Sequence, residues 1–141
     1  MQIVSRGLVF DPARVQDALQ VCSFTSLLQL RDGTFLASCR RGTAKDSADG
    51  NTAIFKSTDQ GATWSEISSG FETQFEGIPG EVRSAELAEL DDGRLLAVLG
   101  WVDRAAGDGV LRDSESDMLP AMHLLQEYSS DGGQRWSGRR V

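Results

Sequence analysis

Arginine and carboxylate side chains recur in three polar segments that each follow an apolar stretch of the chain. A guanidinium group binds a carboxylate through two parallel hydrogen bonds, so arginines are suited to hold an acidic ligand. A carboxyl group beside a glycosidic oxygen can protonate that oxygen when its pKa suits the role. The candidate residues of these types are Asp46 and the set Arg41, Arg83, Asp103, Arg104 and Asp108.

Other kinds of site chemistry are poorly represented. The chain has one histidine, His123, and two cysteines, Cys22 and Cys39. These counts exclude a disulfide-stapled framework and a cysteine-cluster metal site, and they disfavour a His-based zinc site or a Ser-His-Asp triad. We expect both thiols to be reduced and at least partly buried. The acidic loops lack the regular oxygen-ligand spacing of calcium sites, so we expect no metal and no cofactor.

The overall composition is that of an acidic globular chain. It has 141 residues and a net charge of −7, with a sequence pI near 4.6. One domain is expected at this length, and the negative charge argues against a nucleic-acid partner. No apolar run approaches the roughly 20 residues that span a bilayer, so we expect no membrane partner. The segment 1–10 lacks the apolar core of a signal peptide, and the cytoplasm is the default location.

Two sequence patterns occur twice. Residues 27–37 and 87–97 each consist of an apolar run, an Asp-Gly pair and a second apolar run. Asp-Gly between apolar segments is typical of a β-hairpin with a two-residue turn. A Ser-x-Asp-x-Gly-x-x-Trp string follows each hairpin, at 57–64 and at 129–136. The chain therefore contains two copies of one module.

Each module contains four strand-like segments, which predicts an all-β fold of two four-stranded antiparallel propeller blades. Blade one covers about 23–72 and blade two about 81–141, and residues 1–22 hold an N-terminal strand over 2–10 and a short helix after Asp11-Pro12. The predicted strands are 24–30, 34–40, 51–57, 63–68, 83–90, 94–101, 121–128 and 135–141. We expect the chain end to cut the last strand short, which leaves blade two incomplete.

The up-and-down order of such blades predicts where a site would lie. The first and third turns of each blade lie at one end, whereas the second connection and the connection between blades lie at the other. The second group comprises 40–50, 72–82 and 103–120, which are longer and more charged. Functional groups concentrate on loops held by a rigid scaffold, so we expect the functional site at this end.

The Ser-x-Asp-x-Gly-x-Thr-Trp string at 57–64 resembles the Asp-box, and its second copy has Arg135 in place of the threonine. From about residue 21 to 141, the chain resembles the sialidase-like propellers built from bacterial neuraminidase repeats. The resemblance implies a six-bladed propeller and an exo-acting glycoside hydrolase for acidic or sialylated glycans. It also implies a structural role for the Asp-box residues Ser57, Asp59, Gly61, Trp64, Ser129, Asp131, Gly133 and Trp136.

The resemblance also ranks the candidate site residues. Sialidases carry Arg-Ile-Pro nine residues before the first hairpin aspartate, and a second arginine and an acidic aspartate after the next strand. In blade one, Arg41 and Asp46 match the later pair, whereas Ser23 stands in place of the first arginine. Blade two offers an alternative set, Arg83, Arg104 and Asp108. We prefer the set in blade one, so the resemblance implies that Asp46 is the general acid or base. The residues expected to bind an acidic or hydroxylated sugar are Arg41, Arg83, Asp103, Arg104 and Asp108.

Two blades do not close a ring, and the family's tyrosine and glutamate nucleophile pair has no match. The one tyrosine, Tyr128, adjoins the second Asp-box. We expect the chain to be inactive alone and to need further blades, either in the same polypeptide or from a homo-oligomer such as a trimer. A decayed remnant is a third interpretation. The alternative functions are a non-catalytic Asp-box propeller that binds carbohydrate or protein, and a purely structural fragment.

Overall fold

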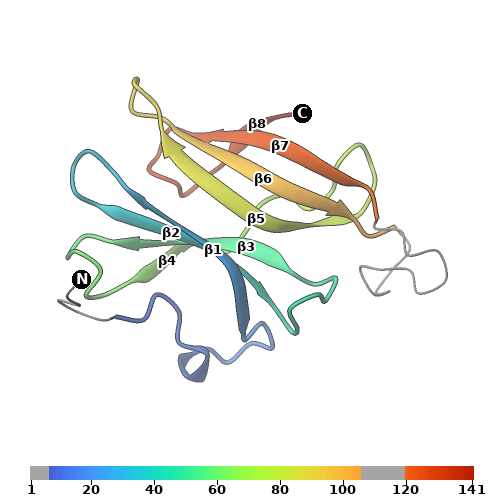
Figure 1. Cartoon of the computed structure of the whole chain (residues 1–141), viewed down its shortest axis with the longest axis horizontal. Helices are drawn as coiled ribbons and strands as arrows, with labels where there is room; N and C mark the ends of the chain where they lie inside the picture. The colour runs from blue at the N-terminus through green and yellow to red at the C-terminus, as the bar shows by residue number, and fades with distance from the viewer. Residues whose placement is uncertain (1–6, 106–119) are drawn as a thin grey trace, which may run out of the picture.

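Two four-stranded antiparallel sheets form the molecule, as the computed structural model of residues 7–105 and 120–141 shows (Figure 1). Each sheet has its strands in chain order, which confirms the two-blade prediction. The first sheet contains β1 (Val21–Gln29), β2 (Phe35–Gly42), β3 (Asn51–Ser57) and β4 (Ser65–Ser68). The second sheet contains β5 (Gly80–Glu89), β6 (Leu95–Asp103), β7 (Met122–Ser129) and β8 (Ser137–Arg140).

The ends of the chain differ from expectation. The expected helix is a single 3₁₀ turn, η1 (Pro12–Arg14), in which the Asp11 carboxylate accepts a hydrogen bond from Ala13 N. Val15 is already extended, so the turn stops there. Residues 7–10 form no strand, and the rest of the segment 2–10 lies outside the described residues. β8 is as long as β4, so the second sheet has all four strands. The described residues contain no helix long and apolar enough to cross a membrane.

The Asp-Gly turns have three residues, so the prediction of a two-residue turn is wrong. Leu30 N donates to Thr34 O over 2.8 Å, and Gly33 N donates to Leu30 O over 2.9 Å. Asp32 keeps a negative φ and its carboxylate accepts from Thr34 N, so only Gly33 needs the left-handed conformation, at φ 87°. A turn followed by a left-handed glycine is the common three-residue hairpin loop. The second hairpin has the same hydrogen bonds.

Hydroxyl groups join the first sheet to the second. Ser38 Oγ and Ser26 Oγ donate to Ala85 O over 2.7 and 3.0 Å, and Thr52 Oγ1 donates to Val82 O over 2.9 Å. All three donors lie on the face of the first sheet that meets β5. Two backbone carbonyls of β5, those of Val82 and Ala85, therefore accept hydrogen bonds from side chains of the neighbouring blade.

Apolar side chains fill both faces of the first sheet. The larger cluster joins the two sheets and the linker after β4, and comprises Ile54, Phe71, Val82, Ala85, Ala97, Leu99, Trp101 and Leu125. The smaller cluster, Ala37, Cys39, Ala53 and Phe55, packs against Val9, Phe10 and Trp64. The N-terminal segment thus covers the outer face of blade one. Both cysteines are free; Cys39 is buried as expected, whereas Cys22 is exposed.

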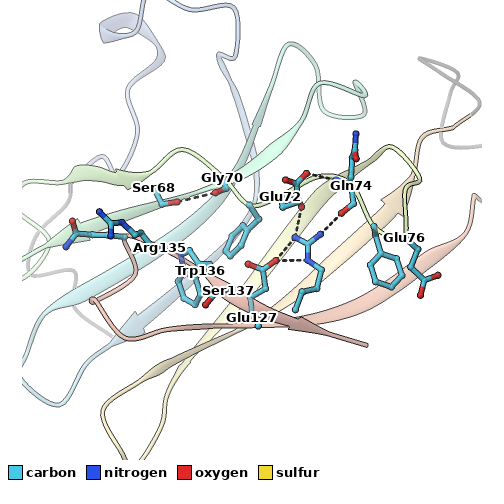
Figure 2. Close-up of a pocket in the computed structure, with 14 residues that line it drawn as sticks. Ser68, Gly70, Glu72, Gln74, Glu76, Glu127, Arg135, Trp136 and Ser137 are labelled. Atoms are coloured by element: carbon cyan, nitrogen blue, oxygen red, sulfur yellow. Dashed lines mark hydrogen bonds and ion pairs between the residues drawn. The ribbon is translucent and has the colours of Figure 1, made fainter.

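The linker over 69–79 is fastened to blade two beside a cavity of about 510 Å³ (Figure 2). Arg139 Nε donates to the buried Glu127 carboxylate over 2.6 Å, and its guanidinium also donates to Gln74 O and Glu72 O. Phe71 packs on Trp136 with ring centres 5.3 Å apart. This arginine accounts for the course of the linker across the face of β7 and β8.

Each of the two Ser-x-Asp turns (57–64 and 129–136) is closed by its own side chains. In the first, Ser57 Oγ donates to the Asp59 carboxylate over 2.8 Å, and Thr63 donates to it from both N and Oγ1. Trp64 Nε1 donates to Gly61 O over 3.0 Å. The second turn repeats the contacts of serine, aspartate and tryptophan. The aspartate thus fixes the backbone conformation between β3 and β4.

We predict that Asp59 makes stability sensitive to acid. Hydrogen bonds from Thr63 and Ser57 lower the pKa of Asp59 from 3.8 to about 2. Because the pKa is lower in the folded state, the stabilisation is complete above the unfolded-state pKa and is lost as pH falls from about 4 towards 2. A carboxyl NMR titration should give a midpoint near 2, and Asp59→Asn should flatten the acid dependence of the unfolding free energy. A wild-type midpoint near 3.8 would contradict this account.

Candidate functional site

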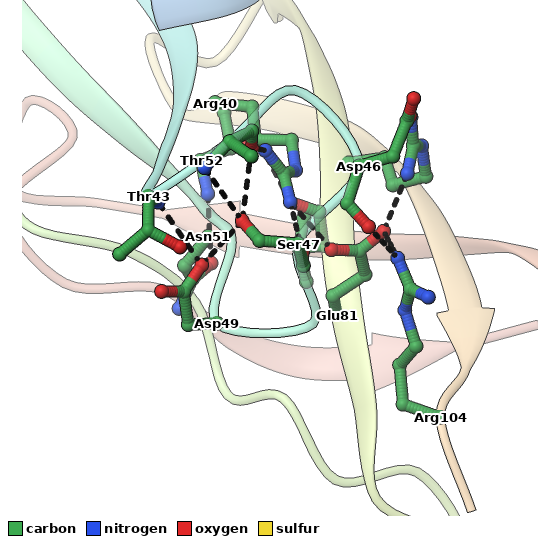
Figure 3. Close-up of polar contacts among 12 residues, drawn as sticks. Arg40, Thr43, Asp46, Ser47, Asp49, Asn51, Thr52, Glu81 and Arg104 are labelled. Carbon is green, nitrogen blue, oxygen red and sulfur yellow. Dashed lines mark hydrogen bonds and ion pairs between the residues drawn. The ribbon is translucent and has the colours of Figure 1, made fainter. Parts of the chain in front are cut away.

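The starts of β1 and β5 and the ends of β2 and β6 lie at one end of the two sheets. The loop after β2 and the linker between the sheets also lie there, as the sequence predicts for the second connections. Arg40 lies near the end of β2, Glu81 and Arg83 near the start of β5, and Arg104 directly after β6. Figure 3 shows the side chains of both blades meeting at this point.

Glu81 is at the centre of the site. Its side chain has no exposed surface, and its carboxylate accepts hydrogen bonds from three arginines. The distances are 2.8 Å to Arg40, 2.7 Å to Arg83 and 2.8 Å to Arg104. A buried carboxylate without partners is strongly destabilising, whereas one with several charge-assisted hydrogen bonds is tolerated. Glu81 therefore depends on arginines from both blades.

Arg40 organises the loop over 43–50. Its guanidinium is fully buried and donates to Ala44 O over 3.0 Å and to Ser47 O. A Cβ at Gly50 would lie about 2 Å from the guanidinium, so any other residue there would force the head of Arg40 to move. The loop is thus wrapped around the head of Arg40. As a result, Asp46 is placed on the exposed side of the cluster.

Asp46 is the accessible carboxylate of the site. Its side chain is 46% exposed, and Arg83 Nη2 donates to Oδ1 over 2.6 Å. Arg104 Nη2 donates to Asp46 O over 2.9 Å, which holds the backbone. The Arg83 guanidinium lowers the pKa of Asp46, so this carboxyl is ionised near neutral pH. In this arrangement Asp46 can act as a base or as a hydrogen-bond acceptor, and a general-acid role requires that a ligand first displaces Arg83.

The site draws on both sets that the sequence offered. Asp46 from the preferred set lies with Arg83 and Arg104 from the alternative set. Asp103 lies at the end of β6 and its carboxylate accepts from Ala105 N over 2.7 Å. Asp108 lies outside the described residues.

Arg41 is not brought to the site. Successive residues of a strand project to opposite faces, so Arg41 leaves the sheet on the side opposite Arg40. Its guanidinium binds the carboxylates of Asp17 and Glu66 over 2.8 and 2.9 Å and lies 4.7 Å from the Phe10 ring centre. Arg41 and Asp46, the preferred set from blade one, thus do not lie together. Arg41 instead anchors the N-terminal segment to blade one.

Sequence reasoning missed Glu81 and Arg40. The Glu81-x-Arg83 spacing was the available indication, since alternate residues of a strand share a face. Three guanidinium groups contact the carboxylates of Glu81 and Asp46 here, and guanidinium groups are suited to bind anionic groups. Among the described residues, no three His, Cys, Asp or Glu side chains are grouped as they would be to hold a metal ion.

The sequence matches no protein-family model and no curated protein. Several solved structures are similar in fold. One is the intramolecular trans-sialidase of Ruminococcus gnavus with oseltamivir carboxylate, at a TM-score of 0.64 and 14% identity, covering 96% of this chain and 51% of that one. Another is the α-L-arabinanase of Penicillium chrysogenum with arabinobiose, at a TM-score of 0.57 and 21% identity, covering 82% and 30%. A third is an α-L-arabinofuranosidase of Fusarium graminearum with an iminosugar inhibitor, at a TM-score of 0.56 and 19% identity, covering 83% and 31%.

These likenesses define the class of fold. The chain consists of two four-stranded blades of a β-propeller of the kind present in these sugar-processing proteins. It spans between about a third and a half of the length of the chains it matches.

We predict that Glu81→Gln strongly destabilises the chain. The substitution keeps the shape of the side chain but leaves three buried or nearly buried guanidinium groups without their shared counter-charge. Removing one partner of a buried ion pair lowers the unfolding free energy by about 3–5 kcal/mol. Urea unfolding should show a loss of this size. Glu86→Gln, on the same strand but at an exposed position, is the matched control and should change stability by less than about 0.5 kcal/mol. A loss below about 1 kcal/mol for Glu81→Gln would argue against a central role for this carboxylate.

Proposed function

We propose that this chain supplies blades of a sialidase-like glycoside hydrolase that is exo-acting on acidic or sialylated glycans. The observation that carries the proposal is the convergence of Arg40, Arg83 and Arg104 on Glu81, with the accessible Asp46 carboxylate beside them. The three similar structures support the reaction class, since their names describe sugar-cleaving or sugar-transferring enzymes. Their ligands are arabinobiose, oseltamivir carboxylate and an iminosugar inhibitor.

Arg83 provides the recognition of the ligand. Its Nη2 already binds the carboxylate of Asp46 over 2.6 Å. Asp46 is the most exposed residue of the cluster. The carboxylate of an acidic sugar takes the same edge of Arg83 and displaces Asp46. Glu81 keeps the other edge of Arg83 in place through a 2.7 Å contact.

Asp46 then becomes available for chemistry. Once separated from Arg83, its carboxyl loses the interaction that lowers its pKa and can act as general acid or base at the glycosidic oxygen. The second catalytic group must come from outside this part of the chain. Tyr128 is remote from the site, because it lies near the end of β7 beside the second Ser-x-Asp turn, with Arg94 over its ring. The chain alone is accordingly inactive.

Further blades complete the propeller in this proposal, either in the same polypeptide or from other copies, with a trimer giving six. The exposed face of β7 is suited to such a neighbour, since Met122 is 58% and Leu124 70% exposed. The alternative function is a non-catalytic propeller that binds carbohydrate or protein. The ion pair of Asp46 with Arg83 favours this alternative, because it lowers the pKa of Asp46 and an ionised carboxylate has no proton to donate to a glycosidic oxygen.

Binding of an acidic sugar tests the proposal. We expect N-acetylneuraminic acid, and not glucose, to bind the chain in a calorimetric titration. Arg83→Gln should weaken this binding about tenfold or more, because hydrogen bonds to charged groups contribute about 1.5–3 kcal/mol. Arg94→Gln removes an exposed arginine at the opposite end of the blade and should leave binding unchanged. The chain alone should release no aglycone from a 4-methylumbelliferyl sialoside.

Equal binding of glucose, or undiminished binding by Arg83→Gln, would refute the recognition role. Binding without hydrolysis by the chain supplemented with its completing blades would favour the non-catalytic alternative.

A further inference from the structure

Phe24 has a strained backbone beside the candidate site. Its φ is +51°, a conformation that is rare for bulky residues and that Asn or Gly adopts more easily. The side chain is 41% exposed, so burial in the core does not account for a phenylalanine here. Residues held in such conformations cluster at ligand-binding sites, where the surrounding structure keeps them in place.

A β-bulge in β1 produces this conformation. Ser23 pairs with Arg40 and Ser26 with Ser38, so Phe24 and Thr25 together face a single residue of β2. A bulge of this type turns a side chain away from its regular direction. Here the Phe24 ring is directed across the blade interface, to the guanidinium of Arg83 on β5.

The Arg83 guanidinium lies over the Phe24 ring. The guanidinium carbon lies 4.8 Å from the ring centre, within the range of a cation–π contact. The edges of Arg83 bind Glu81 over 2.7 Å and Asp46 over 2.6 Å. Arg83 is therefore held at its edges by carboxylates and on one face by Phe24, and a planar guanidinium fixed in this way is pre-organised for a ligand.

We propose that Phe24 is a specificity-determining residue, and that Phe24 and Arg83 together form a platform for the ring of an acidic sugar. The apolar C–H face of the sugar packs on the exposed part of the aromatic ring while the sugar carboxylate binds the edge of Arg83. Sites for small ligands commonly combine aromatic surface with a few charged groups in this way. The inference rests on the proposed function and adds one requirement to it: the ligand must have an apolar ring face beside its acidic group. An acid without such a face makes no contact with Phe24 and binds no more tightly because of it.

The test compares stability and binding in three variants. Phe24→Asn removes the ring and suits the positive φ, Phe24→Tyr keeps the ring, and Leu27→Asn replaces another exposed apolar residue of β1 as the control. The probes are N-acetylneuraminic acid and acetate in calorimetric titrations, with urea unfolding of each variant. We expect Phe24→Asn to bind N-acetylneuraminic acid about tenfold more weakly while its unfolding midpoint is equal to or above that of the wild type. Phe24→Tyr and Leu27→Asn should bind as the wild type does, and acetate should not distinguish the variants.

The outcomes separate this inference from the proposed function. Wild-type affinity of Phe24→Asn for N-acetylneuraminic acid would overturn the platform and leave the proposed function standing. A lower unfolding midpoint and weaker binding in the same Phe24→Asn variant would also overturn the platform, since the ring would then serve only the fold. Absence of binding by the wild-type chain would reject the proposed function and the platform with it.

Discussion

Glu81 bears a negative charge at a position without exposed surface, and its burial is possible only because three guanidinium groups reach it from two different sheets. Arg40 belongs to the first blade, whereas Arg83 and Arg104 belong to the second. If the two sheets shifted relative to each other, at least one of these contacts would open and leave a charge in a poorly solvated place. The relative position of the blades and the shape of the site are therefore determined by the same carboxylate.

The loop after β2 depends on this arrangement in turn. Because Arg40 is fixed by Glu81, the carbonyl groups of Ala44 and Ser47 have a fixed donor to bind, and the loop closes around it. Asp46 is consequently presented to solvent without belonging to any strand. Precise placement of a loop carboxylate by a buried arginine shows how a propeller blade can position a polar group at its rim.

The repeats predicted most of the fold. Two copies of the hairpin and of the Ser-x-Asp string were sufficient to predict eight strands in two sheets, and to predict the end at which the charged side chains meet. The Asp-Gly turns were misjudged because a third turn residue places only Gly33 and Gly93 in the left-handed region. Of the candidate site residues, Asp46, Arg83 and Arg104 lie together, whereas Arg41 projects away, and their roles stay predictions. Adjacent arginines look equivalent in a sequence, and only the packing of a second sheet on one face distinguishes Arg40 from Arg41. The conformation of Phe24 likewise arises from pairing between strands, which no local pattern records.

The hydroxyl contacts between the blades have a consequence for assembly. Ser38 and Thr52 donate to carbonyl groups of β5, but the positions that correspond to them in the second module are Val98 and Leu124. The two modules are thus duplicates in outline with different faces, one polar and one apolar at the same places. A sheet that packed on the second module would therefore meet the side chains of Val98 and Leu124 where β5 meets the hydroxyl groups of Ser38 and Thr52.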